Sequence, residues 1–180
     1  MKTITSQVSG ETITFVKTGK DTNGAYTEII CALPAAQKGP PPHIHPLQDE
    51  IFEAIEGKLE LTANGKKIML EEGQSFKVTA NTAHTFSNPY SQEIKFRATY
   101  KPALNTDYIL EQGFESLNQL PNPKSPGFQA IVDFDFLLKQ IPGQYKFAGV
   151  PTFVLTFFAA IGRLFVKPKV KSLEEYNASP

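Results

Sequence analysis

Short stretches in which apolar and polar residues alternate fill about the first hundred residues of the chain. The stretches rich in β-branched and aromatic side chains are 11–16, 26–33, 51–55, 58–62, 67–70, 75–78, 84–87 and 94–99. Turn-forming residues separate them, and Asn64-Gly65 between two such stretches is typical of a tight hairpin. No long helical pattern intervenes, so we expect a mainly β structure, an antiparallel barrel or jelly roll, over residues 1–104.

The spacing of apolar residues becomes helical after Pro102. Residues 105–107 (Asn-Thr-Asp) predict a helix cap, with the helix running to about residue 120. A Pro-rich linker is expected at 122–127, and apolar residues at helical spacing predict a second helix over 128–141. We therefore expect residues 105–180 to form an α-helical extension, packed on the barrel or on a partner subunit.

The stretch 147–166 is nearly all apolar, and Arg163 is its only charged residue. Pro151 favours a helix that begins there and runs to about residue 166, which is shorter than the roughly 20 residues that cross a bilayer. Thr152, Thr156 and Arg163 form a thin polar stripe on it. We expect no transmembrane span, and a helix buried against the barrel or a partner subunit; interfacial membrane contact or a larger complex is the alternative.

Composition and charge narrow the function classes. Lys+Arg equal Asp+Glu at 18 each, which argues against a nucleic-acid-binding protein. The single cysteine, Cys31, lies in an apolar run and is expected to be a packed thiol. The N-terminal residues lack an apolar core of signal-peptide length, so we expect a cytoplasmic protein.

All three histidines fall in one pattern. His43 and His45 are two residues apart, so on a strand both imidazoles lie on the same face. Glu50 lies five residues after His45, an odd number that would place it on the opposite face of an unbroken strand. A turn at 46–49 is expected to reset the alternation so that Glu50 faces the same interior. Gln48 and Asp49 are alternative oxygen ligands. His84 supplies a third nitrogen from a later strand. Three imidazoles and one carboxylate would leave open positions on a six-coordinate divalent ion, as a reaction centre requires.

This pattern resembles the two motifs of the cupin family. His43-x-His45-x4-Glu50-x6-Gly57 is similar to the first motif, and Gly73-x10-His84-x3-Asn88 is similar to the second. The resemblance implies a cupin double-stranded β-helix, that is a jelly-roll barrel, in which the three histidines and the glutamate hold the metal ion.

The second motif departs from the family pattern, and the departure concerns the turn. Thr79 and Asn81 stand where cupins usually have proline and glycine. Asparagine tolerates left-handed backbone, so Asn81 is expected to keep the turn. Some cupins have lost their metal, and a vestigial site is the alternative here; the complete set of four ligands favours metal binding.

Aromatic residues alternate with the expected ligands along the strands. The residues expected to line a substrate pocket are Phe52, Phe86, Phe76, Phe96 and Tyr100. The alternative interpretation is that these rings fill a small barrel, and the sequence does not separate the two. Lys95 or Arg97 is expected to point inward as the one cation near the site.

The resemblance implies a metal-dependent enzyme acting on a small organic molecule, most often with dioxygenase activity like that of quercetin dioxygenase relatives. Glu50 would serve as a ligand and also as a possible base, the ion would be Fe, Mn, Ni, Zn or Cu, and no organic cofactor is expected. Isomerase or decarboxylase chemistry at the same site is an alternative, as is a non-catalytic cupin that binds a small ligand. Cupin barrels commonly pair, so a homodimer is expected.

Overall fold

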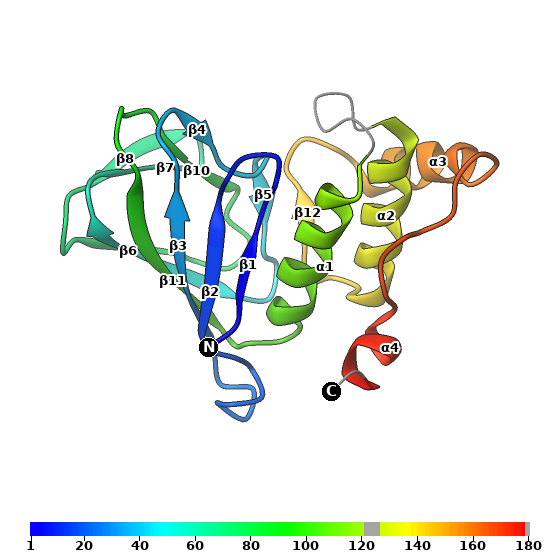
Figure 1. Cartoon of the computed structure of the whole chain (residues 1–180), viewed down its shortest axis with the longest axis horizontal. Helices are drawn as coiled ribbons and strands as arrows, with labels where there is room; N and C mark the ends of the chain where they lie inside the picture. Colours follow the sequence, from blue (N-terminus) through cyan, green and yellow to red (C-terminus); the bar gives the residue numbers. More distant parts are fainter. Residues whose placement is uncertain (121–126, 179–180) are drawn as a thin grey trace.

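The computed structural model describes residues 1–120 and 127–178, in which a β part and a helical part lie side by side (Figure 1). One antiparallel sheet has the order β1 (Thr3–Thr5), β2 (Thr12–Lys17), β3 (Thr27–Leu33), β11 (Ile94–Lys101), β6 (Asp49–Glu56), β9 (Ser75–Val78). The other has the order β12 (Lys146–Phe147), β5 (His43–Ile44), β10 (His84–Asn88), β7 (Leu59–Ala63), β8 (Lys66–Leu70), with β4 (Gln37–Lys38) also paired to β10. The predicted mainly β jelly roll with a helical extension is confirmed.

Every strand expected from the alternating pattern is present, with ends shifted by at most two residues. The hairpin between β7 and β8 turns at Asn64 and Gly65, whose φ angles of 48° and 74° are both left-handed. This is the turn that the Asn-Gly pair predicted. The short strands β1, β4 and β12 were not expected, because segments of two or three residues carry no recognisable alternation.

The core of the β part lies between the two sheets. Burial alternates along β3, β6 and β11, so every second side chain points into the same interior. The largest fully buried members of this core include Phe52, Phe96, Leu33, Leu59 and Leu61. Cys31 is among the buried residues, and its thiol donates a hydrogen bond of 3.2 Å to a Glu11 carboxylate oxygen, so the packed thiol predicted from the sequence is confirmed.

The helical part contains α1 (Thr106–Asn118), α2 (Gly127–Gln140), α3 (Thr152–Gly162) and α4 (Leu173–Ala178). The first two match the expected helices, while the expected Pro-rich linker lies, apart from Gly127, outside the described residues. α3 ends earlier than predicted because the chain turns over residues 163–165. Within the described residues, none of the helices combines the length and hydropathy needed to cross a bilayer.

Buried polar contacts fix the helices beside the sheets. The Asp107 carboxylate accepts hydrogen bonds from the Gly19 backbone N–H (2.8 Å) and the Thr27 hydroxyl (2.9 Å). The short strand β12, which comes from the region between α2 and α3, pairs with β5 in the second sheet. The extension therefore contributes a strand to the β part, directly beside the residues expected to bind metal.

Candidate metal centre

His43 and His45 enter the interior from β5 and the residue that follows it. The approach to β5 crosses β10 so closely that a Cβ atom on Gly39 would lie 2.5 Å from the Phe86 carbonyl oxygen, so only glycine fits there. The His43 Nδ1 lies 3.0 Å from the Pro41 carbonyl oxygen. A ring nitrogen facing a carbonyl carries the proton, which leaves the His43 Nε2 lone pair for the centre.

Glu50 enters from β6 with its side chain turned inward. The neighbouring Asp49 points outward, where it accepts hydrogen bonds from Lys77 (2.8 Å) and the Ala80 backbone N–H (2.9 Å). The Gln48 amide is buried but donates to the Pro102 and Ala103 carbonyls, at 2.8 and 3.0 Å. Asp49 is thus engaged outside the interior, the Gln48 amide nitrogen is held by the carbonyls that follow β11, and the reset of strand parity before Glu50 is confirmed.

His84 enters from β10, where it pairs in register with His43 of β5. The preceding turn contains Asn81 in the left-handed region with a φ of 64°, so the asparagine keeps the turn as predicted. The His84 Nδ1 lies 2.9 Å from the Thr82 carbonyl oxygen, which orients the ring in the same way as His43.

The four side chains converge on one point. His43, His45, Glu50 and His84 each offer one ligand atom, and these atoms all lie within 4.8 Å of one another. All four residues are buried, at 5%, 6%, 1% and 2% exposed respectively. This convergence of three imidazoles and a carboxylate is a donor set that suits a divalent transition-metal ion.

The contacts inside the cluster fit a cation between the ligands. The Glu50 Oε2 lies 2.8 Å from the His84 Nε2 and 3.4 Å from the His45 Nε2. Because the His84 Nδ1–H already faces the Thr82 carbonyl, its Nε2 can face a carboxylate only if it carries a second proton or donates its lone pair to a cation. The proton and the metal ion therefore compete for this position.

Burial and mutual charge set the protonation of the ligands. Burial lowers the pKa of His43 to about 3, and burial also lowers the pKa of His45. Burial alone would raise the pKa of Glu50, but the hydrogen bond with His84 and the neighbouring imidazoles bring it down to about 2. The pKa of His84 is raised, because its hydrogen bond and charge interaction with Glu50 outweigh burial. At neutral pH, Glu50 is ionised and His43 is neutral, which is the state that binds metal.

Tyr145 lies over the centre and was not identified from the sequence. Its ring stacks on the His43 ring with centroids 5.1 Å apart and planes 12° apart, and it meets the His45 ring edge-on at 5.5 Å. It directly precedes β12, so the pairing of β12 with β5 places it there. The only signal available was the alternation in Tyr145-Lys146-Phe147 after the Pro142-Gly143 break, which is too short to predict a strand beside β5.

The aromatic residues predicted to line a pocket divide into two groups. Tyr100 meets the His45 ring edge-on at 5.6 Å, and Phe52 meets the His84 ring edge-on at 6.1 Å. Phe96 and Phe86 pack against Phe52 and each other deeper in the core, with centroids 4.9 to 6.0 Å apart. Phe76 is partly buried at the core's edge. Tyr100 and Phe52 are thus next to the ligands.

The expectation that Lys95 or Arg97 points inward is wrong. Both residues lie on the outer face of β11, because residues two apart share a face and the inner face belongs to Phe96. Lys95 pairs with Glu56 at 2.9 Å, and Arg97 pairs with Glu53. Neither cation reaches the metal centre.

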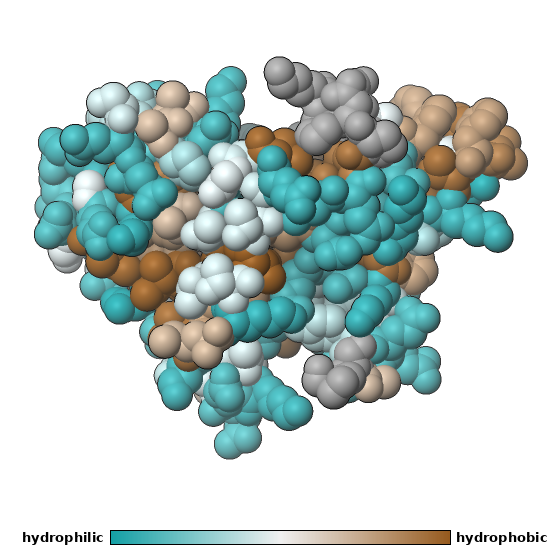
Figure 2. Space-filling view, viewed as in Figure 1, coloured by the Kyte–Doolittle hydropathy of each residue, from teal (hydrophilic) through white to brown (hydrophobic). Residues whose placement is uncertain are grey.

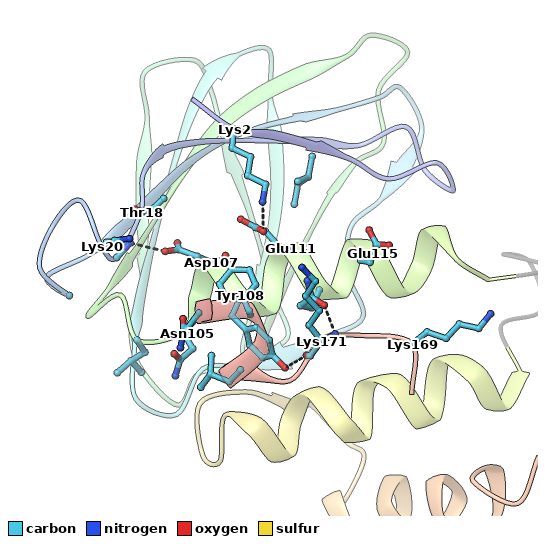
Figure 3. Close-up of a pocket in the computed structure, with 18 of the residues that line it drawn as sticks. Lys2, Thr18, Lys20, Asn105, Asp107, Tyr108, Glu111, Glu115, Lys169 and Lys171 are labelled. Carbon is cyan, nitrogen blue, oxygen red and sulfur yellow. Dashed lines mark hydrogen bonds and ion pairs between the residues drawn. The ribbon is translucent and has the colours of Figure 1, made fainter. Parts of the chain in front are cut away.

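A cavity of about 850 Å³ lies away from the metal centre, between the N-terminal strands and helices α1 and α4 (Figure 3). Its lining contains none of the four metal-binding residues. An ion pair between Lys2 and Glu111 forms part of its wall, and cations and carboxylates are mixed around it (Figure 3). Such a mixed lining gives no preference for a ligand of either charge.

Comparisons with known proteins agree with this fold. Residues 29–100 match the family model described as a cupin domain. Together with the jelly roll and the four converging ligands, this match shows that the chain contains a cupin domain. A comparison with curated proteins gave no match.

Solved structures with a similar fold include a predicted oxalate decarboxylase from Thermotoga maritima, which is 17% identical with a TM-score of 0.50 over 56% of this chain and 90% of that chain. An RmlC-like cupin from Shewanella frigidimarina is 18% identical, with a TM-score of 0.48 over 55% and 82%. A sugar phosphate isomerase from Silicibacter pomeroyi is 20% identical, with a TM-score of 0.46 over 52% of this chain and 60% of that chain. At these identities the likeness concerns the fold alone.

Proposed function

We propose that this chain is a metal-dependent enzyme that acts on a small organic molecule, with dioxygenase-type chemistry as the reaction class. One observation carries the proposal: four buried ligand groups converge within 4.8 Å beneath an aromatic cover. A divalent ion held by His43, His45, Glu50 and His84 would supply a Lewis acid with open positions for substrate and dioxygen.

The charges around the centre favour a neutral or aromatic substrate. Lys95 and Arg97, the cations of β11 nearest the site residues in the sheet, pair with carboxylates on the outer face and do not reach the four ligands. A phosphate or a free carboxylate would require a cation to offset its charge on burial. The outward positions of Lys95 and Arg97 therefore support a substrate without such a group.

Two side chains of the chain itself would act on the substrate. The Tyr145 ring, stacked above His43, would contact an aromatic substrate; burial and the nearby Glu50 raise the pKa of its phenol, so it stays protonated and able to donate a hydrogen bond. Glu50 is ionised at neutral pH and would accept a proton from the substrate when it loosens from the ion. Phe52 and Tyr100 would complete the wall nearest the ligands, with Phe76, Phe86 and Phe96 behind them.

Oxygen uptake tests the reaction class. The protein loaded separately with Fe(II), Mn(II), Ni(II), Zn(II) or Cu(II) would be assayed with flavonols, diketones and catechols, with His84→Ala as the matched control. Metal-dependent oxygen consumption with at least one substrate is the expected result. Turnover without oxygen uptake would indicate an isomerase or decarboxylase, and thermal stabilisation by a ligand without turnover would indicate a non-catalytic binding protein.

A homodimer in the cytoplasm is part of the same proposal. The edge strand β1 is paired with β2 on one side. On its other side Asn118 of α1 donates to the Thr5 carbonyl and accepts from the Gln7 backbone N–H, so the part around Thr3 would be left to pair with a second copy. Gel filtration at micromolar concentration is expected to give the mass of a dimer, and a monomer would contradict this part of the proposal.

A further inference from the structure

Helix α3 packs the small residues Ala159 and Gly162 and the Thr156 hydroxyl toward α2, and its phenylalanines point outward. The Thr156 hydroxyl donates a 2.9 Å hydrogen bond to Asp135 of α2, and Arg163 forms an ion pair with the same carboxylate. Asp135 itself is 2% exposed. Of the polar stripe expected from the sequence, Thr156 and Arg163 therefore contact α2, whereas Thr152 is exposed. The helix packs on α2 and not on the barrel, so that expectation is wrong, while burial against a partner subunit stays a prediction.

The outward face forms what we call the α3 apolar surface. Its members and their exposed fractions are Phe153 74%, Phe157 60%, Phe158 46%, Leu164 79% and Phe165 71%. Figure 2 shows hydrophobic residues gathered over α3, at the end of the molecule away from the sheets. A group of large exposed apolar side chains of this kind marks a surface that another apolar phase or molecule covers.

The sequence around this surface carries charge of one sign. No aspartate or glutamate occurs from residue 136 to residue 173, whereas the same stretch contains six cations, although the whole chain has no net charge. The cations are Lys139, Lys146, Arg163, Lys167, Lys169 and Lys171. Within the described part of the chain, Lys167 is exposed, forms no ion pair and follows Phe165 by two residues, whereas Lys169 lines the cavity beside α1 together with Glu111 and Glu115 (Figure 3). The segment is thus both apolar and basic.

We propose that the α3 apolar surface binds the surface of a bilayer that contains anionic lipids. Phenylalanines would enter the boundary between headgroups and acyl chains, while Lys167, next to Phe165 at the edge of this surface, would contact the negative headgroups. The 11 residues of α3 extend only about 16 Å, about half the hydrocarbon thickness of a bilayer, so the helix would lie along the interface and not cross it.

The same charges disfavour a second copy of the chain as the occupant. A two-fold contact through α3 would bring the basic segments of both copies together, with like charges facing one another. An anionic lipid surface instead supplies the opposite charge and an apolar phase at once. This proposal does not depend on the reaction proposed for the metal centre.

Vesicle sedimentation with the full chain tests the proposal. Vesicles of phosphatidylcholine alone are compared with vesicles that also contain phosphatidylglycerol, at low and high salt. We expect binding to the anionic vesicles only, weakened by salt. The variant F153S/F157S/F165S is expected to lose binding, and K167E is expected to weaken it about tenfold.

Matched variants on the β part control for general effects. K66E changes one exposed lysine of β8, and M69S removes a half-exposed apolar side chain of the same strand; both should bind vesicles like the wild type. Circular dichroism checks that every variant folds. The proposal is overturned if the wild type binds neither vesicle, or if binding survives in F153S/F157S/F165S. A dimer that this variant abolishes, with no vesicle binding, would also overturn it and assign the surface to a protein partner.

Discussion

The two parts of this molecule place their polar and apolar side chains in opposite ways. In the β part, phenylalanines lie in the interior, next to the buried cluster of three imidazoles and a carboxylate. In α3, the buried residues are the small Ala159 and Gly162, Asp135 holds Thr156 and Arg163, and the phenylalanines face outward. The contrast shows that an aromatic residue in this chain contributes to stability in one part and to surface interactions in the other, so identical substitutions should have different effects.

Removal of a barrel phenylalanine should have the largest effect. Phe96 is 1% exposed and packs against Phe52 and Phe86, so Phe96→Ala leaves a cavity in the core. We expect the free energy of unfolding to fall by about 3–5 kcal/mol, measured by urea denaturation. A loss below about 1 kcal/mol would mean that the ring lines an open pocket instead of filling the core.

The buried carboxylate under α3 should have the next largest effect. Asp135→Asn keeps the size of the side chain but removes the charge that Lys139 and Arg163 share. We expect a loss of roughly 1–3 kcal/mol in the free energy of unfolding, since a partly buried charge network is broken. Lys139 is the half-exposed partner of Asp135, so Lys139→Ala should lower the free energy of unfolding by well under about 1 kcal/mol and serves as the control.

Acidification should destabilise the metal-free protein. The pKa of His43 is lowered from 6.5 to about 3 by burial, so the unfolded chain takes up a proton below pH 6.5 that the folded chain resists. The stability present above pH 6.5 is therefore lost as the pH falls from 6.5 towards 3, by at most about 1.4 kcal/mol per pH unit for this histidine. His45 acts in the same direction, and Glu50 adds a further loss below pH 4.5.

His84 acts in the opposite direction, because its pKa is raised. It stabilises the folded state below pH 6.5, and that contribution is lost as the pH rises through its folded pKa. Thermal unfolding between pH 4 and 8 measures the balance. His43 and His45 together outweigh His84, so a melting temperature that rises on acidification would contradict the burial of these ligands.

An exposed phenylalanine of α3 should have the smallest effect on stability. Phe153 is 74% exposed, so Phe153→Ala should change the free energy of unfolding by less than about 0.5 kcal/mol. A loss similar to that of Phe96→Ala in urea denaturation would show that α3 is covered within the molecule in solution, and would remove the contrast between the two parts.

The convergence of His43, His45 and Glu50 could be predicted from the sequence because local rules place them, whereas His84 was placed by its fit to the second cupin motif. His43 and His45 are two residues apart, and a single turn separates them from Glu50, so strand parity sufficed. Tyr145 could not be predicted, since its position depends on the pairing of β12 with a strand about one hundred residues earlier. The polar stripe of α3 was recognised, but its direction depends on Asp135, a residue of another helix. The prediction that Lys95 or Arg97 points inward was wrong because residues two apart on a strand share a face, and on β11 the inward face belongs to Phe96 between them.

The metal content of the purified protein tests the central claim most directly. Protein prepared without added metal, and again after loading with Fe(II), Mn(II), Ni(II), Zn(II) or Cu(II), would be measured by elemental analysis beside His84→Ala. The converging set of His43, His45, Glu50 and His84 predicts about one equivalent of a divalent ion per chain in the wild type, and a loss of affinity of about 100-fold or more in His84→Ala. A wild type that holds no stoichiometric metal under any loading condition, or a variant that retains as much as the wild type, would contradict the account.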